Sequence, residues 1–179
     1  QGNRYYKRHL VPIGEFVPFG ELLRPIAPFF NLPMSSFSRG SDAQENILVQ
    51  GHRFATAICY EMAFSDELRQ NVHADTDYLL TVSNDTWFGT SHGPWQHMAI
   101  TRMRAVEFAK PVIRATNSGV TLAIDAKGRP IQMLPQFQQQ VLRVDVAPAQ
   151  GQTPYNRFGS WPLIAWVVLA LGLSYGQRR

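Results

Sequence analysis

One thiol and one rare ammonium group are the side chains best suited to covalent chemistry in this sequence. Cys59 is the single cysteine, which excludes an internal disulfide framework and a zinc cluster of several thiolates. Lys7 is one of only three lysines, against 14 arginines. A cysteine thiolate is a strong nucleophile, and a nearby ammonium can favour the thiolate and stabilise an oxyanion. The residues alone leave open whether the fold brings the two together, since a free cysteine is commonly a small buried hydrophobe and a lone lysine is commonly solvated.

The residues around Cys59 indicate a sharp turn between a strand and a helix. Residues 54–58 are a short apolar run, and residues 64–71 have the spacing of one or two helical turns. A nucleophile at such an elbow is exposed at the edge of a sheet. The backbone N–H of the next residue, Tyr60, can then stabilise an oxyanion.

The remaining elements alternate between strands and helices, which predicts an α/β layered domain. The run 78–82 is apolar throughout, as in a strand buried on both faces. A helix is expected over residues 95–109, opened by Gly93-Pro94 and ended before Pro111. Further strands are expected over residues 112–116, 120–124 and 141–146.

The end of the chain predicts a membrane anchor. Residues 158–175 are 18 consecutive residues without a charge, close to the length that spans a bilayer. The terminal pair Arg178-Arg179 favours a cytoplasmic end, with the rest of the chain on the other side. We therefore expect a catalytic domain over residues 1–156, lacking its N-terminal part, and a transmembrane helix with a short tail over residues 157–179. The alternative is a buried helix of a soluble protein.

A second apolar segment, residues 16–37, is interrupted by four prolines that forbid a long helix. It is interpreted as a lid facing lipid, with core filling as the alternative.

Composition excludes several classes of protein. The chain is 45% hydrophobic and 17% charged, which excludes a disordered protein. The net charge of +4 is scattered rather than clustered, which argues against a nucleic-acid partner. Because the sequence starts at Gln1 without an initiating methionine, we treat it as the C-terminal portion of a longer protein.

Several ordered motifs resemble the carbon–nitrogen hydrolase (nitrilase) superfamily. They are YKRHLVPIGE at 6–15, ICYE at 58–61, SNDTWFG at 83–89, WQH at 95–97, NSG at 117–119 and DAKG at 125–128. Together with PMSSFSRG at 33–40 and the C-terminal apolar segment, they resemble the C-terminal third of the bacterial apolipoprotein N-acyltransferases, a family within that superfamily. The resemblance covers essentially the whole chain.

The resemblance implies a fold and a set of site residues. The fold is a nitrilase-like αββα sandwich followed by one transmembrane helix. Cys59 matches the nucleophile and Lys7 the oxyanion-stabilising lysine, while the glutamate that completes the Glu–Lys–Cys triad lies upstream of this chain. Glu15 and Glu61 match supporting carboxylates, and Tyr60 and Trp87 lie with them around the substrate.

The same resemblance implies the reaction and its partners. A fatty acyl chain moves from a phospholipid to Cys59, and then to the α-amine of a diacylglyceryl-cysteine on a prolipoprotein, with no metal or cofactor. We expect from this resemblance a monomer of the bacterial inner membrane, with its catalytic domain on the periplasmic side.

Three rival interpretations remain at this point. The first is a membrane-anchored amidase that hydrolyses a small amide with the same triad. The second is a non-catalytic membrane scaffold in which Cys59 only packs. The third pairs Cys59 with one of the five histidines, although none lies in a matching local signature; His97 is interpreted as structural.

Overall fold

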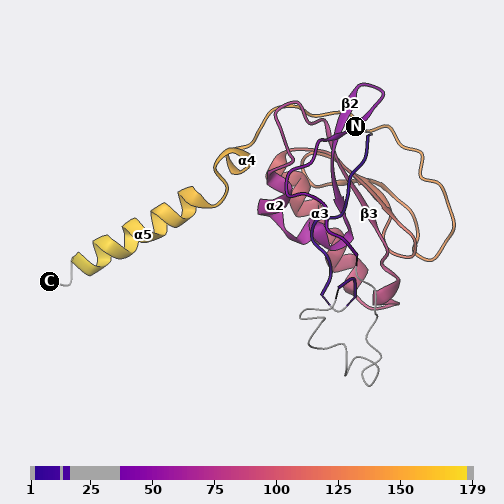
Figure 1. Ribbon diagram of the computed structural model, residues 1–179, viewed down its shortest axis with the longest axis horizontal. Coiled ribbons are helices and arrows are strands. Elements are labelled where there is room, and N and C mark those ends of the chain that lie inside the picture. Colours follow the sequence, from indigo (N-terminus) through magenta and orange to yellow (C-terminus); the bar gives the residue numbers. More distant parts are fainter. Residues whose placement is uncertain (1–2, 13, 17–36, 177–179) are drawn as a thin grey trace, which may run out of the picture.

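The computed structural model describes residues 3–12, 14–16 and 37–176 (Figure 1). Their strands form one six-stranded sheet. The sheet order is β1-β2-β3-β4-β5-β6, the same as the chain order. The strands are β1 (Ile47–Val49), β2 (His52–Ile58), β3 (Tyr78–Ser83), β4 (Val112–Thr116), β5 (Leu122–Ile124) and β6 (Pro130–Met133). Strands β2, β3 and β4 are parallel, and each remaining pair is antiparallel.

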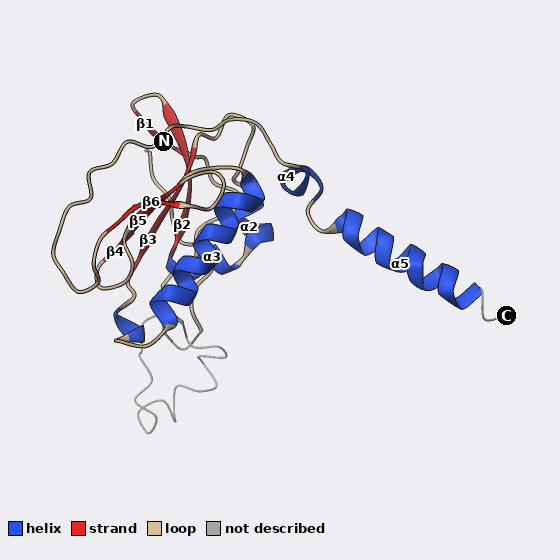
Figure 2. Cartoon of the chain, turned by 180° about the vertical axis from the view of Figure 1, so that it is seen from behind, coloured by secondary structure: helices blue, strands red, loops and turns tan. Residues whose placement is uncertain are grey.

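The parallel strands are joined by helices that lie on one face of the sheet (Figure 2). The 3-10 helix η2 (Cys59–Ala63) and α2 (Ser65–Arg69) connect β2 to β3. The 3-10 helix η3 (Thr86–Phe88) and α3 (Gly93–Phe108) connect β3 to β4. Helix α3 is followed by its C-cap residue Ala109, which adopts a left-handed conformation (φ 50°) shortly before Pro111. The expected strands at 54–58, 78–82, 112–116 and 120–124 and the expected helix are confirmed to within a few residues.

The core lies between the sheet and these helices. Side chains of alternate strand positions point to the helical face, where they are buried against η2, α2 and α3. They include Ala55, Leu79, Val112, Leu122 and Ile124, packed with Met62, Leu68, Ala105 and Phe108. This packing fixes the carboxyl ends of three parallel strands at one edge of the sheet, where ligand sites of open α/β sheets form.

The expected α/β fold is confirmed, whereas one of the expected strands needs correction. The described residues form one sheet and one helical layer, which is half of the expected αββα sandwich. Residues 141–146 do not form a strand, although they alternate in polarity. No strand among the described residues pairs with them, and Val141 is 82% exposed.

The C-terminal part forms two helices, of which α4 packs on the body through Tyr155 and Asn156. Helix α4 (Pro154–Phe158) is capped at its N-terminus by Thr153, whose side chain accepts a hydrogen bond from Asn156 N–H and donates one to the Glu107 carbonyl. Helix α5 (Trp161–Gly176) projects away from the sheet, and every one of its residues is exposed (Figure 1). Within the described ranges, no helix combines the length and the apolar character needed to cross a bilayer. The proposed lid lies outside the described residues, apart from Phe16 and Phe37 at its two ends.

Candidate active site

Cys59 lies at the carboxyl end of β2, where the chain turns into η2. Its backbone φ is 55°, in the left-handed region that residues with a side chain seldom adopt. The side chain is half-buried. The predicted elbow is therefore present, and a non-glycine residue in this conformation requires support from its surroundings.

The carboxylate of Glu61 connects this elbow to the segment that carries Lys7. Its Oε2 accepts a hydrogen bond from Ile58 N–H at 2.6 Å, directly before Cys59. Its Oε1 accepts from the backbone N–H groups of Arg8 at 2.6 Å and His9 at 3.0 Å, directly after Lys7. Tyr5 donates its hydroxyl to Oε2 at 3.0 Å, and burial followed by the charge of Glu61 raises the pKa of Tyr5 well above its ordinary value. One buried carboxylate thus holds the residues beside both predicted catalytic side chains.

Lys7 forms an ion pair with the second predicted carboxylate. Its Nζ lies 2.6 Å from Glu15 Oε1, and the two side chains are 12% and 25% exposed. The other oxygen, Oε2, accepts a hydrogen bond from Val11 N–H at 2.8 Å. The structure therefore brings Lys7 and Glu15 together.

We expect Glu61→Gln to lower both stability and activity. An amide offers one acceptor oxygen where the carboxylate accepts four hydrogen bonds, and its NH₂ would face donors. Losing charge-assisted bonds in a buried site costs about 2–4 kcal/mol of unfolding free energy. Thermal unfolding and Cys59 alkylation by iodoacetamide measure the two effects, with Glu45→Gln at an exposed carboxylate as the control. Equal unfolding temperatures and equal Cys59 alkylation rates for the two variants would contradict the positioning role of Glu61.

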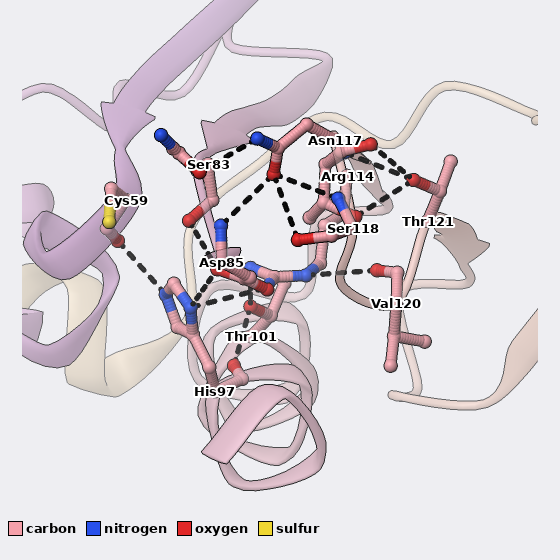
Figure 3. Close-up of polar contacts among 12 residues, drawn as sticks. Cys59, Ser83, Asp85, His97, Thr101, Arg114, Asn117, Ser118, Val120 and Thr121 are labelled. Atoms are coloured by element: carbon pink, nitrogen blue, oxygen red, sulfur yellow. Dashed lines mark hydrogen bonds and ion pairs between the residues drawn. The ribbon is translucent and has the colours of Figure 1, made fainter. Parts of the chain in front are cut away.

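A second polar cluster lies beneath Cys59 and consists of Asp85, His97 and Arg114 (Figure 3). Arg114 Nη2 lies 2.7 Å from Asp85 Oδ2, and both side chains are fully buried. The ring of His97 has Nδ1 at 3.1 Å from Asp85 Oδ1 and Nε2 at 3.0 Å from the carbonyl oxygen of Cys59. His97 thus contacts the backbone carbonyl of Cys59 and not its thiol. This contact does not support the alternative in which a histidine pairs with the Cys59 thiol.

The cluster is charged, and its members stabilise one another. Burial alone would raise the pKa of Asp85, but hydrogen bonds from His97 and Ser83 and the charge of Arg114 outweigh it, so the pKa lies below its ordinary value. Burial lowers the pKa of Arg114, and the charge of Asp85 opposes that effect. Gly119 makes room for the pair, because a Cβ there would lie 2.0 Å from Asp85 Oδ2.

Asp85 gives a prediction for acid stability. A carboxyl whose pKa is lowered by folding stabilises the native state above its unfolded pKa, about 3.9, and this contribution is lost as the pH falls through the lower folded value. Asp85→Asn also leaves the Arg114 charge buried without its partner, which costs about 3–5 kcal/mol. We therefore expect the variant to unfold at a lower temperature than wild type at pH 7. The difference between the two unfolding temperatures should become smaller below about pH 4. A difference in unfolding temperature that does not change with pH would contradict the stabilising role of ionised Asp85.

The rim of the site carries exposed aromatic and amide side chains. Tyr60 is 42% and Trp87 76% exposed, so neither is a core aromatic. The loop after β3 is joined to the turn after β4, because Asn117 donates its Nδ2–H to Asn84 Oδ1 at 2.7 Å and accepts from Asp85 N–H at 3.2 Å.

Among the described residues, no group of three or more histidine, cysteine, aspartate or glutamate side chains is arranged to hold a metal ion.

Sequence reasoning missed the cluster beneath Cys59. The one available signal was Arg114, a charge in the middle of the mostly apolar strand Val112–Thr116. Such a charge needs a buried partner. The sequence does not identify Asp85 and His97 as that partner, because they lie 29 and 17 positions away.

Comparison with known proteins gives a family and close relatives. The family model for carbon–nitrogen hydrolases matches residues 2–154. The apolipoprotein N-acyltransferase of Vibrio vulnificus is 58% identical over 98% of this chain, and that of Haemophilus influenzae is 51% identical over 94%. The chain spans 35% and 32% of the length of these two relatives, about a third in each case.

Solved structures support the fold. A branch 10 nitrilase-superfamily member from Saccharomyces cerevisiae matches 58% of this chain and 41% of its own, at 19% identity and a TM-score of 0.50. An amidase from Nesterenkonia sp. AN1 matches 85% of this chain and 52% of its own, at 14% identity and a TM-score of 0.50. Both likenesses concern the arrangement of strands and helices alone.

Proposed function

This chain belongs to the carbon–nitrogen hydrolase family, and we propose that it carries the nucleophile and oxyanion lysine of an apolipoprotein N-acyltransferase. The observation that carries the proposal is the 58% identity to such an enzyme over 98% of the chain. The geometry supports it, because the single cysteine occupies a strained elbow and Glu61 holds the Lys7 segment beside that elbow.

In the first half-reaction, Cys59 Sγ attacks an ester carbonyl of a phospholipid. The thiol proton passes to the general base, the glutamate that the family carries upstream, and an S–C bond forms. The tetrahedral oxyanion is stabilised by the Lys7 ammonium and the N–H of Tyr60. The ester C–O bond then breaks, the leaving lysophospholipid oxygen takes the proton, and an acyl-Cys59 thioester remains.

In the second half-reaction, the α-amine of a diacylglyceryl-cysteine attacks the thioester. The glutamate removes a proton from the amine, the C–S bond breaks, and the thiol is regenerated as the amide forms. The products are a triacylated lipoprotein and free enzyme. Glu15 holds Lys7 during both steps, and Trp87 lies at the rim, where an acyl chain or acceptor would pass.

We place the working enzyme in the bacterial inner membrane, as a monomer with residues 1–156 on the periplasmic side. The support is the apolar segment that begins after Arg157: α5 has no charged residue, and all of its side chains are exposed. A helix that is apolar on every side is suited to a lipid environment. In this arrangement residues 157–179 anchor the domain beside its lipid donor.

The proposal is tested with the purified full-length protein in detergent. We expect it to transfer an acyl chain from phospholipid to a synthetic diacylglyceryl-cysteine peptide, detected as a mass gain of the peptide. Hydrolysis of small amides without peptide acylation would favour the amidase alternative and contradict the proposal. An inert thiol that neither gains an acyl group nor reacts with iodoacetamide would favour the scaffold.

A further inference from the structure

We propose that His97 is a positioning residue for the nucleophile, which acts by holding the carbonyl of Cys59 in the orientation that presents the thiol. The inference rests on the proposed function only in taking Cys59 as the nucleophile. It assigns His97, Asp85 and Arg114 a role toward the reaction, in addition to packing.

The protonation of His97 Nε2 follows from its partner. A carbonyl oxygen only accepts hydrogen bonds, so the ring nitrogen at 3.0 Å from Cys59 O must carry a hydrogen. The other nitrogen, Nδ1, lies 3.1 Å from both Asp85 Oδ1 and Arg114 Nη2. It either donates to the carboxylate in the charged ring or accepts from the guanidinium in the neutral ring. The Nε2–H bond to Cys59 is present in both states.

This bond supports a backbone conformation that needs support. Cys59 has a φ of 55°, which is disfavoured for a residue with a Cβ. The N–H before it, on Ile58, is held by Glu61, and its own carbonyl is held by His97. That carbonyl belongs to the same peptide group as the Tyr60 N–H. Fixing it therefore also fixes the direction of the proposed oxyanion donor.

The ring of His97 is itself held by three elements of the fold (Figure 3). His97 lies on α3, Asp85 follows β3 and Arg114 lies on β4. Arg114 also donates to the Val120 carbonyl at 3.1 Å and to Thr101 Oγ1 at 3.3 Å. With side chains that are 0–9% exposed, the cluster has little freedom to rearrange. It is a rigid support for the bond to Cys59.

Two amide replacements separate this role from simple packing. In His97→Gln the amide nitrogen lies about as far from the backbone as Nε2 of the histidine, so it can still donate to Cys59 O. In His97→Asn the amide nitrogen lies about as far as Nδ1, so it faces Asp85 and cannot reach Cys59 O. Loss of alignment at a reacting centre costs about 100-fold in rate. We expect acyl-Cys59 formation from phospholipid to be about 100-fold slower in His97→Asn and to stay within about tenfold of wild type in His97→Gln. KM for the donor should be unchanged in both variants.

If His97 only packed, His97→Asn would be acylated as fast as His97→Gln or faster. Both amides leave a similar gap, and Asn retains the contact with Asp85. Equal rates for the two variants, or a faster Asn variant, would overturn the proposal. If neither variant folds, Thr101→Val provides the test, since it removes a contact of Arg114 and a hydrogen bond to the His97 carbonyl with little change of shape. We then expect several-fold slower acylation at unchanged KM, and an unchanged rate would overturn the proposal.

Alkylation of Cys59 by iodoacetamide separates failure of this inference from failure of the proposed function, because it needs no lipid. If wild type forms no acyl-enzyme but its alkylation is faster than that of His97→Asn and similar to that of His97→Gln, the positioning role stands and the acyltransferase assignment fails. If wild type forms the acyl-enzyme and all three proteins are acylated and alkylated equally fast, the positioning role fails and the assignment stands.

Discussion

Cys59→Ala in the full-length protein is expected to lower acyl transfer by roughly 10³-fold or more, because removal of a covalent nucleophile leaves only binding and oxyanion stabilisation. The rate of peptide acylation from phospholipid measures this loss. The fold should be retained, since Cys59 is half-buried and the replacement removes a single sulfur atom. Thermal unfolding close to that of wild type provides the control.

A Cys59→Ala enzyme that transfers acyl groups at a normal rate would contradict the assignment of the nucleophile. A variant that loses activity together with stability would indicate a structural role for the thiol. The serine variant distinguishes chemistry from packing, because it preserves shape and differs in nucleophilicity. We expect it to be nearly as inactive as the alanine variant.

Lys7→Arg is expected to lose most activity, by about 10²–10³-fold, while the protein remains folded. The Lys7 ammonium is a compact charge held 2.6 Å from Glu15, in a site where its side chain is only 12% exposed. A guanidinium is planar and broader, so it retains the charge but not the position from which an oxyanion donor acts. The rate of acyl-Cys59 formation measures the loss.

The matched control for this substitution is Lys127→Arg. Lys127 is another of the three lysines and lies exposed in the turn after β5. It should tolerate the same change without effect on rate or stability. Near-normal acylation by Lys7→Arg would show that Lys7 is not an oxyanion partner.

Local sequence patterns were sufficient to predict most strands of the sheet and the turn at Cys59. The apolar runs of β2 and β3, the Gly93-Pro94 start of α3 and the turn at Asn117 are each encoded within a few neighbouring residues. Residues 141–146 show the limit of this reasoning. Alternation of polar and apolar residues predicts a strand only where a partner strand is available, and pairing is a property of the whole fold.

The site could be predicted only in part, for a related reason. The motifs predict Lys7, Glu15, Cys59 and Glu61 as site residues, but they do not reveal that Glu61 binds the backbone beside both Lys7 and Cys59. The carboxylate contacts residues 52 and 53 positions away, and no local pattern encodes such a distance. The role of His97 was hidden in the same way, because its partner is a backbone carbonyl 38 positions away rather than a side chain.

The proposed mechanism requires that an acyl group resides on Cys59 between donor and acceptor. Its most direct test is intact-protein and peptide mass spectrometry of the full-length enzyme after incubation with phospholipid alone. We predict a mass gain of one acyl chain, located on the peptide that contains Cys59 and removed by hydroxylamine or by the diacylglyceryl-cysteine acceptor. An enzyme that transfers acyl chains to the acceptor while Cys59 is never acylated would contradict the account.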